Sequence, residues 1–552
     1  MADWLEFAPF IDVDDALGVG QTRLITTWGL VERTSSWSTD LLGANWQRLT
    51  FPQRPQFDPN VLPSVDFGRH DLGDEVVLER DTTWGDRPRF DWTFRQGDYS
   101  DTYSEGLFRV HSNAGVGIDL GFAFLGSNGF SFNDNRKKRI LTVSSFGPIR
   151  PSLSWHAQFD QFTDGTTILV PSPYADPAFV PPTREDLLWR LQGELGHMAD
   201  SVADWTLNAS VQSGHQRLKN GSYRLNAKDR LWQLAGTGDW RGWLLDAKAG
   251  LAHFDIDSTN ADRWQAQARA ARSWRLNRSW LGSIRLSLDG DGDNSAGLSA
   301  VAALTPDSAA PWWQPGVRAA TERVAPSLID LDYPKRTMPL ILNQVPITYV
   351  EEGDPDLPVQ WENSLSLHWN GGGDSTGHWA LTAHTAYVSD YTTWDQGYDS
   401  LVNSNYVYAP RARDVRVFGG AIHGDHHLFW KLFLFADYAA KYAADLHNEK
   451  LAGYYPHKGS LMASLIAPQW GYGVDVRLNA TGLWWYGDKR IVPTDYTTNH
   501  VFRVDLSGSA RIKGMTLYAL VQNVAGYRYR TSAGYPFTTR MVRFGFNILL
   551  LD

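Results

Sequence analysis

The chain has 552 residues and a net charge of −10, which makes nucleic acid an unsuitable partner. It contains no cysteine, so disulfides, thiol catalysis and thiolate metal sites are excluded. Aromatic residues make up 13% of the chain and glycine occurs 49 times, a composition that favours β-structure. No apolar run reaches the roughly 18 residues of a membrane-spanning helix, so the sequence predicts none.

The first 85 residues have the least regular pattern in the chain. The stretch "QTRLITTWGLV" (21–31) is compatible with one strand, whereas "RLTFPQRPQFDPNVLPSVDFGRHD" (48–71) is rich in Pro and irregular. We expect residues 1–85 to lie in the lumen of a barrel or on its periplasmic side, without forming a complete plug. The barrel itself is expected to comprise residues 86–552.

From about residue 87, apolar and polar side chains alternate in runs of about nine to eleven residues, the length that crosses a bilayer at a tilt. In "LLWRLQGELGH", Leu187, Trp189 and Leu191 lie on one face, with Arg190 and Gln192 on the other. The same alternation recurs in the runs 205–212, 280–288, 472–480 and 502–512. The apolar face is expected to meet lipid and the polar face a wet lumen.

The chain from residue 87 onward has room for about 22 strands. The average length of a strand together with its connection is then typical of membrane barrels. Short turns are expected at 197–204, 276–278, 424–426 and 513–514. Long connections are expected at 163–185, 329–360 and 486–499. The pattern predicts an all-β fold, a large transmembrane antiparallel β-barrel with short periplasmic turns and long extracellular loops, in the cell outer membrane.

The final stretch, "GYPFTTRMVRFGFNILLLD", also alternates. Its outward residues are expected to be Val542, Phe544, Phe546, Ile548 and Leu550. Unpaired backbone groups in lipid cost several kcal/mol each, so this strand is expected to pair with the first barrel strand. That partner should begin between about Trp84 and Asp101, after the irregular region. The same five residues are expected to present a C-terminal signal to barrel-assembly machinery.

Three segments in the C-terminal half resemble the barrel of TonB-dependent outer-membrane receptors. They are "RVAPSLIDLDYP" (323–334), "EEGDPDLPVQWENSLSL" (351–367) and "LVQNVAGYRYRTSAGYPFTTRMVRFGF" (520–546), in the order that the family uses. In the last segment the matching positions are Asn523, Tyr529, Gly534, Tyr535, Pro536 and Arg540. The resemblance implies uptake of a solute across the outer membrane and contact with outer-membrane lipid and lipopolysaccharide.

The N-terminal part departs from that family. Neither the family's plug pattern nor its TonB box is recognisable in residues 1–100, and residues 90–166 are more similar to plugless porins with receptor-like barrels. A separate plug, a lipoprotein or an energy-coupling protein is therefore an expected partner. Nucleic acid is not.

Two sets of residues are candidates for contact with a solute. Charged side chains on the polar faces are the expected pore lining: Arg285, Lys431, Asp437, Lys441, Asp475, Arg477, Arg503, Asp505 and Arg511. Both signs occur, so selectivity for one sign is not predicted. Aromatic residues near strand ends are either extracellular ligand contacts or part of an interfacial girdle: Trp394, Tyr398, Tyr406, Tyr408, Trp484, Trp485 and Tyr486.

Three further chemistries are disfavoured by the sequence. "DGDGDN" (289–294) resembles a calcium loop but lacks its Gly and Glu positions, which favours a polar hairpin loop. "HGDHH" (423–427) is expected in a tight turn that points its imidazoles apart, which disfavours a metal site. No nucleophile and base share a pattern, so we expect no enzyme activity and no cofactor.

The sequence therefore favours an outer-membrane transport barrel, either receptor-like or porin-like. The alternative is a structural or assembly barrel within a larger outer-membrane complex, its lumen filled by partner chains. A secreted soluble β-protein is a more distant third interpretation.

Overall fold

The computed structural model describes most of the chain from residue 88 to 551 and seven short backbone strands within residues 1–87. The main undescribed connections are 129–135, 168–182, 307–314, 467–473, 487–497 and 527–539. Side chains are also left undescribed in 336–349, 393–408 and 474–502, where only the backbone strands are given.

Twenty-two strands form one closed antiparallel wall, which confirms the expected fold class and strand number. The first half comprises β8 (Arg89–Gly97), β9 (Thr102–His111), β10 (Gly117–Ser127), β11 (Arg136–Arg150), β12 (Leu153–Thr167), β13 (Thr183–His197), β14 (Trp205–Asn220), β15 (Tyr223–Trp240), β16 (Trp243–Ile256), β17 (Thr259–Arg275), β18 (Trp280–Asp291), β19 (Gly297–Pro306) and β20 (Gly316–Val324). The second half comprises β23 (Gln360–Gly373), β24 (Gly377–Asp399), β25 (Asn405–His427), β26 (Leu432–Asp445), β27 (His457–Ile466), β28 (Val474–Tyr486), β29 (Thr498–Ile512), β30 (Met515–Gln522) and β31 (Met541–Leu551). A single 3-10 turn, Asp98–Ser100, links β8 to β9.

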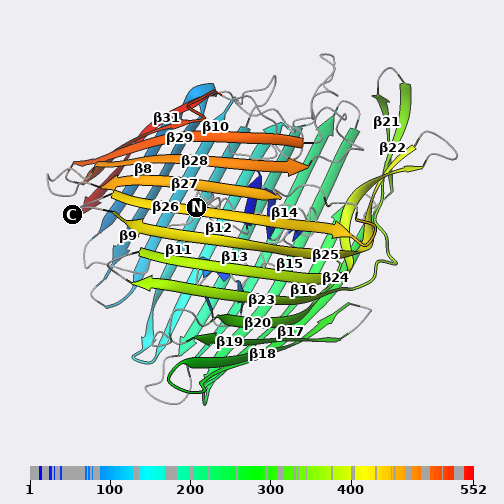
Figure 1. Ribbon diagram of the computed structural model, residues 1–552, viewed down its shortest axis with the longest axis horizontal. Helices are drawn as coiled ribbons and strands as arrows, with labels where there is room; N and C mark the ends of the chain where they lie inside the picture. Colours follow the sequence, from blue (N-terminus) through cyan, green and yellow to red (C-terminus); the bar gives the residue numbers. More distant parts are fainter. Residues whose placement is uncertain are drawn as a thin grey trace.

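The wall strands are tilted, as closure into a barrel requires. In Figure 1 the near strands β23–β29 cross the far strands β11–β17 at a clear angle. A hairpin of β21 (Arg336–Leu342) and β22 (Val345–Glu351) stands outside the wall, because β20 pairs directly with β23 while β22 runs parallel to β25. The long connection expected at 329–360 therefore contains two strands of its own.

The seam of the barrel joins the last strand to the first. β31 pairs with β8 from Arg543 opposite Gly97 to Leu551 opposite Arg89, which places the partner strand inside the expected window. Side chains reinforce the seam: Phe546 stacks on Phe94 with ring centroids 5.6 Å apart, and Asn547 donates a 2.8 Å hydrogen bond to Thr93.

A buried carboxylate also ties the seam together. The Asp101 side chain is 1% exposed and lies 2.8 Å from Nε of Arg543 and 3.5 Å from a terminal nitrogen of Arg95. Asp98 accepts a 2.7 Å hydrogen bond from the backbone N–H of Val542. The contacts of Asp101 with Arg543 and of Asp98 with Val542 join residues more than 440 positions apart in sequence, so they hold the two ends of the barrel segment together.

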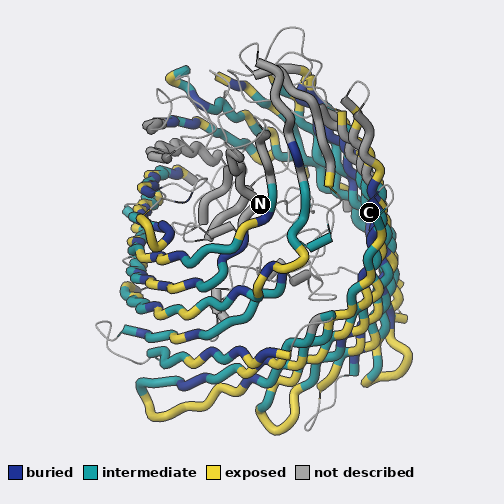
Figure 2. Tube along the Cα trace, turned by 90° about the vertical axis from the view of Figure 1, so that its right-hand side faces the viewer, coloured by how far each residue is buried: buried dark blue, intermediate teal, exposed yellow. Residues whose placement is uncertain are grey.

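Apolar residues face outward and polar residues face inward, the reverse of a soluble protein. In β13, Leu191 is 50% exposed, whereas its neighbours Arg190 and Gln192 are each 3% exposed. In β10, Leu120 and Phe122 are exposed while Asp119 is fully buried. Figure 2 shows the resulting alternation of buried and exposed residues along the strands. Because a closed barrel leaves no unpaired edge, a wall with this apolar outer face is suited to span a lipid bilayer.

Connections differ between the two rims. Those at the rim where β31 ends are mostly short, such as Arg241–Gly242 between β15 and β16, while the other rim carries the longest ones. By this pattern the first rim is periplasmic and the second extracellular. β24 and β25 each have 23 residues, so they extend well beyond the roughly nine to eleven needed to cross a bilayer.

One expected turn was wrong. β25 continues through the segment 424–426 to His427, and the connection to β26 begins after it. His423, Asp425 and His427 stay on one face and lie opposite Asp437, Phe435 and Phe433 of β26, respectively. The alternation of a strand thus persists through a Gly-Asp pair that reads as a turn in the sequence.

Residues 1–87 contain only short strands in the described backbone. They are β1 (Ile11–Asp14), β2 (Leu24–Thr27), β3 (Leu30–Val31), β4 (Ser38–Thr39), β5 (Arg69–His70), β6 (Gly73–Asp74) and β7 (Val77–Leu78). β1–β3 form a small antiparallel sheet, and β4–β7 and β5–β6 are separate pairs. The location of this region in the lumen or periplasm stays a prediction. Within the described residues, no helix has the length and apolarity needed to cross a membrane.

Candidate solute path

The inner face of the wall gathers polar side chains from at least twelve of its strands in the described part of the chain. Among the described inward residues, the following are all less than a tenth exposed: Asp119, Lys138, Arg190, Gln192, Asn208, Gln212, Asp229, Ser283, Ser287, Ser299, Ser366, Thr382, His384, Asp437, Lys441, Lys458, Ser460, Ser464, Arg503 and Asp505. Strand alternation puts them inside because the apolar partner at each next position faces outward. The lumen is therefore polar along the wall.

Charges on this face occur in opposite-sign pairs. Arg190 of β13 lies 2.7 Å from Asp160 of β12, which also accepts a 2.7 Å hydrogen bond from Gln158. Asp160 and Arg190 are directly opposite each other in the strand register, so the pair forms across adjacent strands. Such pairing fixes the charged groups and leaves the lining of this part of the wall without a dominant sign.

A second group of charges lies on β18 and β20. Arg285 is 2.8 Å from Glu322, and Arg318 is 3.9 Å from the other oxygen of the same carboxylate. Arg285 was expected in the pore lining, and the structure places it on the inner face next to Ser283 and Ser287. Its role in conduction stays a prediction.

Other expected lining residues lie on β26 and β29. Asp437 accepts a hydrogen bond from Ser460 of β27, and Lys441, four residues further along the same face of β26, is 4% exposed. Arg503 lies 2.8 Å from Asp505, which in turn accepts a 2.8 Å hydrogen bond from the backbone N–H of Asn523. Asp437, Lys441, Arg503 and Asp505 thus sit on the inner face, and their role as pore lining stays a prediction.

Four further residues were expected in the pore lining. Arg511 is exposed near the end of β29. Lys431 lies outside the described residues, as do the side chains of Asp475 and Arg477, whose backbone belongs to β28. For these four residues, pore lining stays a prediction.

The candidate aromatic contacts lie at the extracellular ends of three strands. In the extension of β24 and β25, Tyr398 is opposite Tyr406, and Trp394 is opposite Pro410. Tyr408 lies opposite Gln396 in the same hairpin. The remaining members, Trp484, Trp485 and Tyr486, end β28. The backbone thus brings four of the seven into one hairpin beyond the bilayer, while their side chains are outside the described residues.

An apolar cluster lies on the inner face of β24, β25 and β26, toward their extracellular ends. Its members are Ala386, Val388, Tyr391, Val415, Val417, Ala421, Ala439, Ala443 and Leu451. Leu451 follows β26, is 5% exposed, and its N–H donates a 3.0 Å hydrogen bond to the carbonyl of Ala443. Leu451 therefore packs against this cluster on the inner face.

Sequence reasoning missed this cluster and the ion pair of Arg190 with Asp160. The pair requires the register between β12 and β13, which alternation alone does not specify. The cluster had a signal: Val415 and Val417 are apolar on the face where neighbouring runs carry charges. Apolar residues on a lumen face indicate that another segment covers them.

The two motifs considered as metal sites, 289–294 and 423–427, lie largely in strands. Asp289 lies in β18 and accepts hydrogen bonds from Gln267 and Ser299, so this part of the calcium-like motif is strand and not loop. His423 and His427 contact Phe435 and Phe433, each with ring centroids 4.5 Å apart. Among the described residues, no group of three or more His, Cys, Asp or Glu is placed to hold a metal ion.

Comparisons with known proteins give a consistent fold. The sequence matches no protein-family model and no curated protein. Its structure is similar to the copper transporter OprC (TM-score 0.76, 12% identity, covering 100% of this chain and 98% of that one). It is also similar to the FrpB iron transporter from Neisseria meningitidis (TM-score 0.75, 10% identity, 100% and 96% covered) and to the siderophore receptor PirA from Pseudomonas aeruginosa (TM-score 0.71, 12% identity, 100% and 96% covered).

These neighbours are TonB-dependent receptors built on one large β-barrel. The expectation that this chain lacks a recognisable plug stays a prediction. With its apolar outer wall, polar lumen and closed seam, the chain has the β-barrel fold of outer-membrane transporters and receptors.

Proposed function

We propose that this protein takes up a small polar solute across the outer membrane through the lumen of its barrel. The observation that carries the proposal is the closed wall of 22 strands, apolar outside and charged inside. An apolar outer face needs lipid, and a polar lumen offers a path on which a hydrated solute keeps polar partners. The neighbours named for copper, iron and siderophores have the same architecture.

A barrel of this width requires something in its lumen, because membrane barrels with about 22 strands are plugged. The near-complete burial of inward residues such as Asp119, Phe254 and Val415 supports a filled lumen. We assign that filling to residues 1–85, with Leu451 packing against the inner face from the connection after β26. Solute would pass once this material shifts, and an energy-coupling partner in the periplasm would supply the work.

The paired charges bear on the choice of solute. Arg190 with Asp160, Arg285 with Glu322, and Arg503 with Asp505 leave little net charge on these parts of the lining. We therefore propose that the lumen does not select solutes by the sign of their charge. Uptake aside, the protein is proposed to contact lipopolysaccharide with its outer wall and to depend on barrel-assembly machinery for insertion.

Release of solutes from proteoliposomes tests the proposal. We expect vesicles with the full chain to release small entrapped solutes slowly, and vesicles with a variant lacking residues 1–85 to release the same solutes quickly, because the lumen is then less filled. Protein-free vesicles are the control. The rates are followed by a self-quenching dye and by sugars of increasing size.

Three results would contradict the proposal in different ways. If neither protein releases any solute, the lumen is not a path. If both release solutes at the same rate, residues 1–85 do not fill the lumen. If the full chain passes large dextrans freely, the lumen is built to be filled by another chain, as in a structural or assembly barrel.

A further inference from the structure

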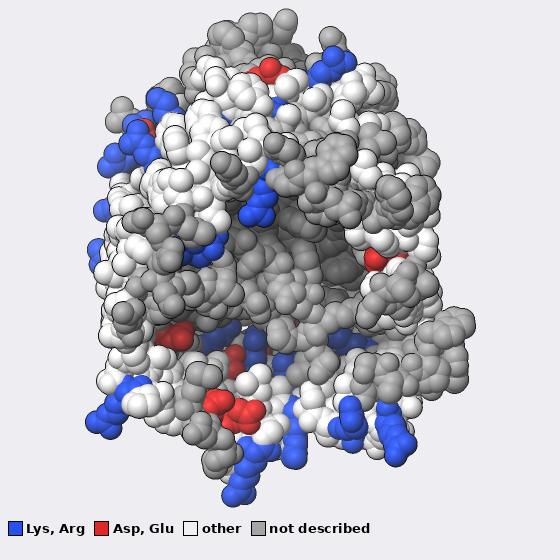
Figure 3. All heavy atoms as spheres, turned by 90° about the vertical axis from the view of Figure 1, so that its left-hand side faces the viewer, with Lys and Arg blue, Asp and Glu red and all other residues white. Residues whose placement is uncertain are grey.

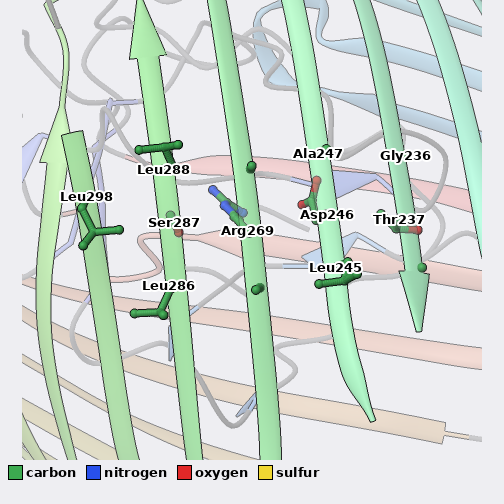
Figure 4. Close-up of a pocket in the computed structure, with 13 residues that line it drawn as sticks. Gly236, Thr237, Leu245, Asp246, Ala247, Arg269, Leu286, Ser287, Leu288 and Leu298 are labelled. Atoms are coloured by element: carbon green, nitrogen blue, oxygen red, sulfur yellow. The ribbon is translucent and has the colours of Figure 1, made fainter. Parts of the chain in front are cut away.

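A depression in the outer wall lies over β15 to β19. Its volume is about 550 Å³, and Figure 4 shows leucines standing around a floor of small residues. The leucines are Leu245, Leu286, Leu288 and Leu298, each of which is on the apolar side of its strand. Because these side chains point away from the lumen, the depression opens toward lipid and is separate from the solute path.

Strand register explains why the wall is hollow here. Outward-facing residues that are paired across adjacent strands form two neighbouring rows over the wall. The small residues of these rows form the floor of the depression. One row runs Gly236, Ala247, Ala268, Leu288, Leu298, and the next runs Gly238, Leu245, Ala270, Leu286. On the β14 side the same rows continue with the larger Leu207 and Trp205. Small residues between large ones leave a shallow trough.

The next row toward the periplasmic rim carries aromatic and cationic groups. Trp240 is opposite Trp243, which is opposite Arg272. The Arg272 guanidinium lies 5.4 Å from the centre of the Trp243 ring, and that of Arg241 lies 5.1 Å from the centre of the Trp240 ring. Tryptophan on the outer wall of a barrel marks the membrane interface, so these two cations lie at the depth of lipid phosphates.

The surrounding charge favours an anion at this place. Arg275 and Arg278 follow Arg272 at the same rim and are exposed. Two acidic residues, Asp204 and Asp239, lie at this rim with their backbones joined by a hydrogen bond, and Asp239 accepts a further one from the backbone N–H of Gly242, which holds the turn in place. Figure 3 looks onto this rim and shows several Lys and Arg side chains projecting from its edge.

We propose that the depression is a binding site for an anionic phospholipid of the periplasmic leaflet. One acyl chain lies in the trough, where Leu245 and Leu286 contact it from the sides and Ala268 and Ala270 let it approach the backbone. The phosphate binds Arg272 and Arg241, whose cation–π contacts keep both guanidinium groups oriented. The site lies near the periplasmic rim, where the membrane leaflet consists of phospholipid. Lipopolysaccharide would place its phosphates at the opposite, extracellular rim.

Close packing and charge act together in this site. An acyl chain that fills a trough gains dispersion contacts that it does not make on a convex wall. Each Arg near an anionic lipid surface strengthens binding by about fivefold. The site should therefore retain one lipid through detergent extraction, whereas lipids on the rest of the wall exchange.

Native mass spectrometry of the full chain in detergent tests the proposal, with dioleoyl phosphatidylglycerol as the probe and the zwitterionic dioleoyl phosphatidylethanolamine for comparison. We expect one phosphatidylglycerol to stay bound to the wild-type protein in preference to phosphatidylethanolamine. Arg272→Gln should weaken that binding by about fivefold, the effect of one Arg near an anionic lipid. Arg150→Gln, at the periplasmic end of β11 and away from this depression, should leave it unaltered.

A second pair of variants tests the trough itself. Ala268→Leu fills the floor and should abolish retention of the lipid, while Ala209→Leu adds the same side chain to the outer face of β14, outside the trough, and should not. Heat-modified migration on a gel checks that all variants are folded. Equal retention by Arg272→Gln and wild type, equal retention by the two leucine variants, or co-purification of a polypeptide in place of lipid would overturn the proposal.

Discussion

Deleting Phe544–Asp552 is expected to abolish accumulation of the protein in the outer membrane. The deletion removes most of β31, which pairs with β30 on one side and β8 on the other. Both neighbours would then present unpaired N–H and C=O groups to lipid, at a cost of several kcal/mol per group. Membrane fractions probed with an antibody to an extracellular tag would report the loss.

The matched control removes Asp552 alone, which lies beyond the last paired residue of β31. This shortened protein should accumulate normally and keep its heat-modifiable migration. If the chain lacking Phe544–Asp552 also reached the outer membrane as a protease-resistant barrel, β31 would not be needed to close the wall. The proposed role of its outward residues as an assembly signal would fall with it.

The second large effect concerns the outer face. Leu234→Arg is expected to destabilise the barrel by about 2–4 kcal/mol, because Leu234 faces outward near the middle of β15 and a charge there must enter the lipid. Leu234 is 53% exposed and lies between Ala209 and Ala249, so neither neighbour shields a longer side chain from lipid.

Gln233→Arg provides the comparison, since Gln233 is the adjacent residue and faces the polar lumen. We expect it to cost much less than Leu234→Arg. Unfolding of each variant by urea from lipid vesicles gives the free energies. Similar losses for both variants, or a larger loss for Gln233→Arg, would mean that the assignment of the two faces is wrong.

Alternation predicted the faces of the wall because a strand repeats every two residues, and one side of a membrane barrel must be apolar. In the runs 187–195, 205–212 and 280–288, most of the large residues expected outside, such as Leu191, Leu207 and Leu288, are exposed, whereas Gly282 is buried. The window for the first barrel strand followed from the need to pair β31. These features depend only on residue composition and on the two-residue period of a strand, and both can be read from one sequence.

Alternation did not predict which strand positions meet. The pairing of Arg190 with Asp160 depends on register, and a shift of two residues would leave the faces unchanged while separating the charges. The end of β25 at His427 was also missed, because a strand that passes the bilayer surface has no compositional mark. The inward cluster around Val415 needed knowledge of the segment that covers it.

A disulfide across the seam tests the closed barrel most directly. The native chain has no cysteine, so the double variant Thr93→Cys/Asn547→Cys contains a single pair, placed at positions that face each other and are already hydrogen-bonded through their side chains. Oxidation should produce an intrachain disulfide in nearly all molecules, seen as a mass loss of two hydrogens, whereas Ile25→Cys/Asn547→Cys should stay reduced. If the first pair does not crosslink, or the second does so in its place, the barrel does not close between β31 and β8.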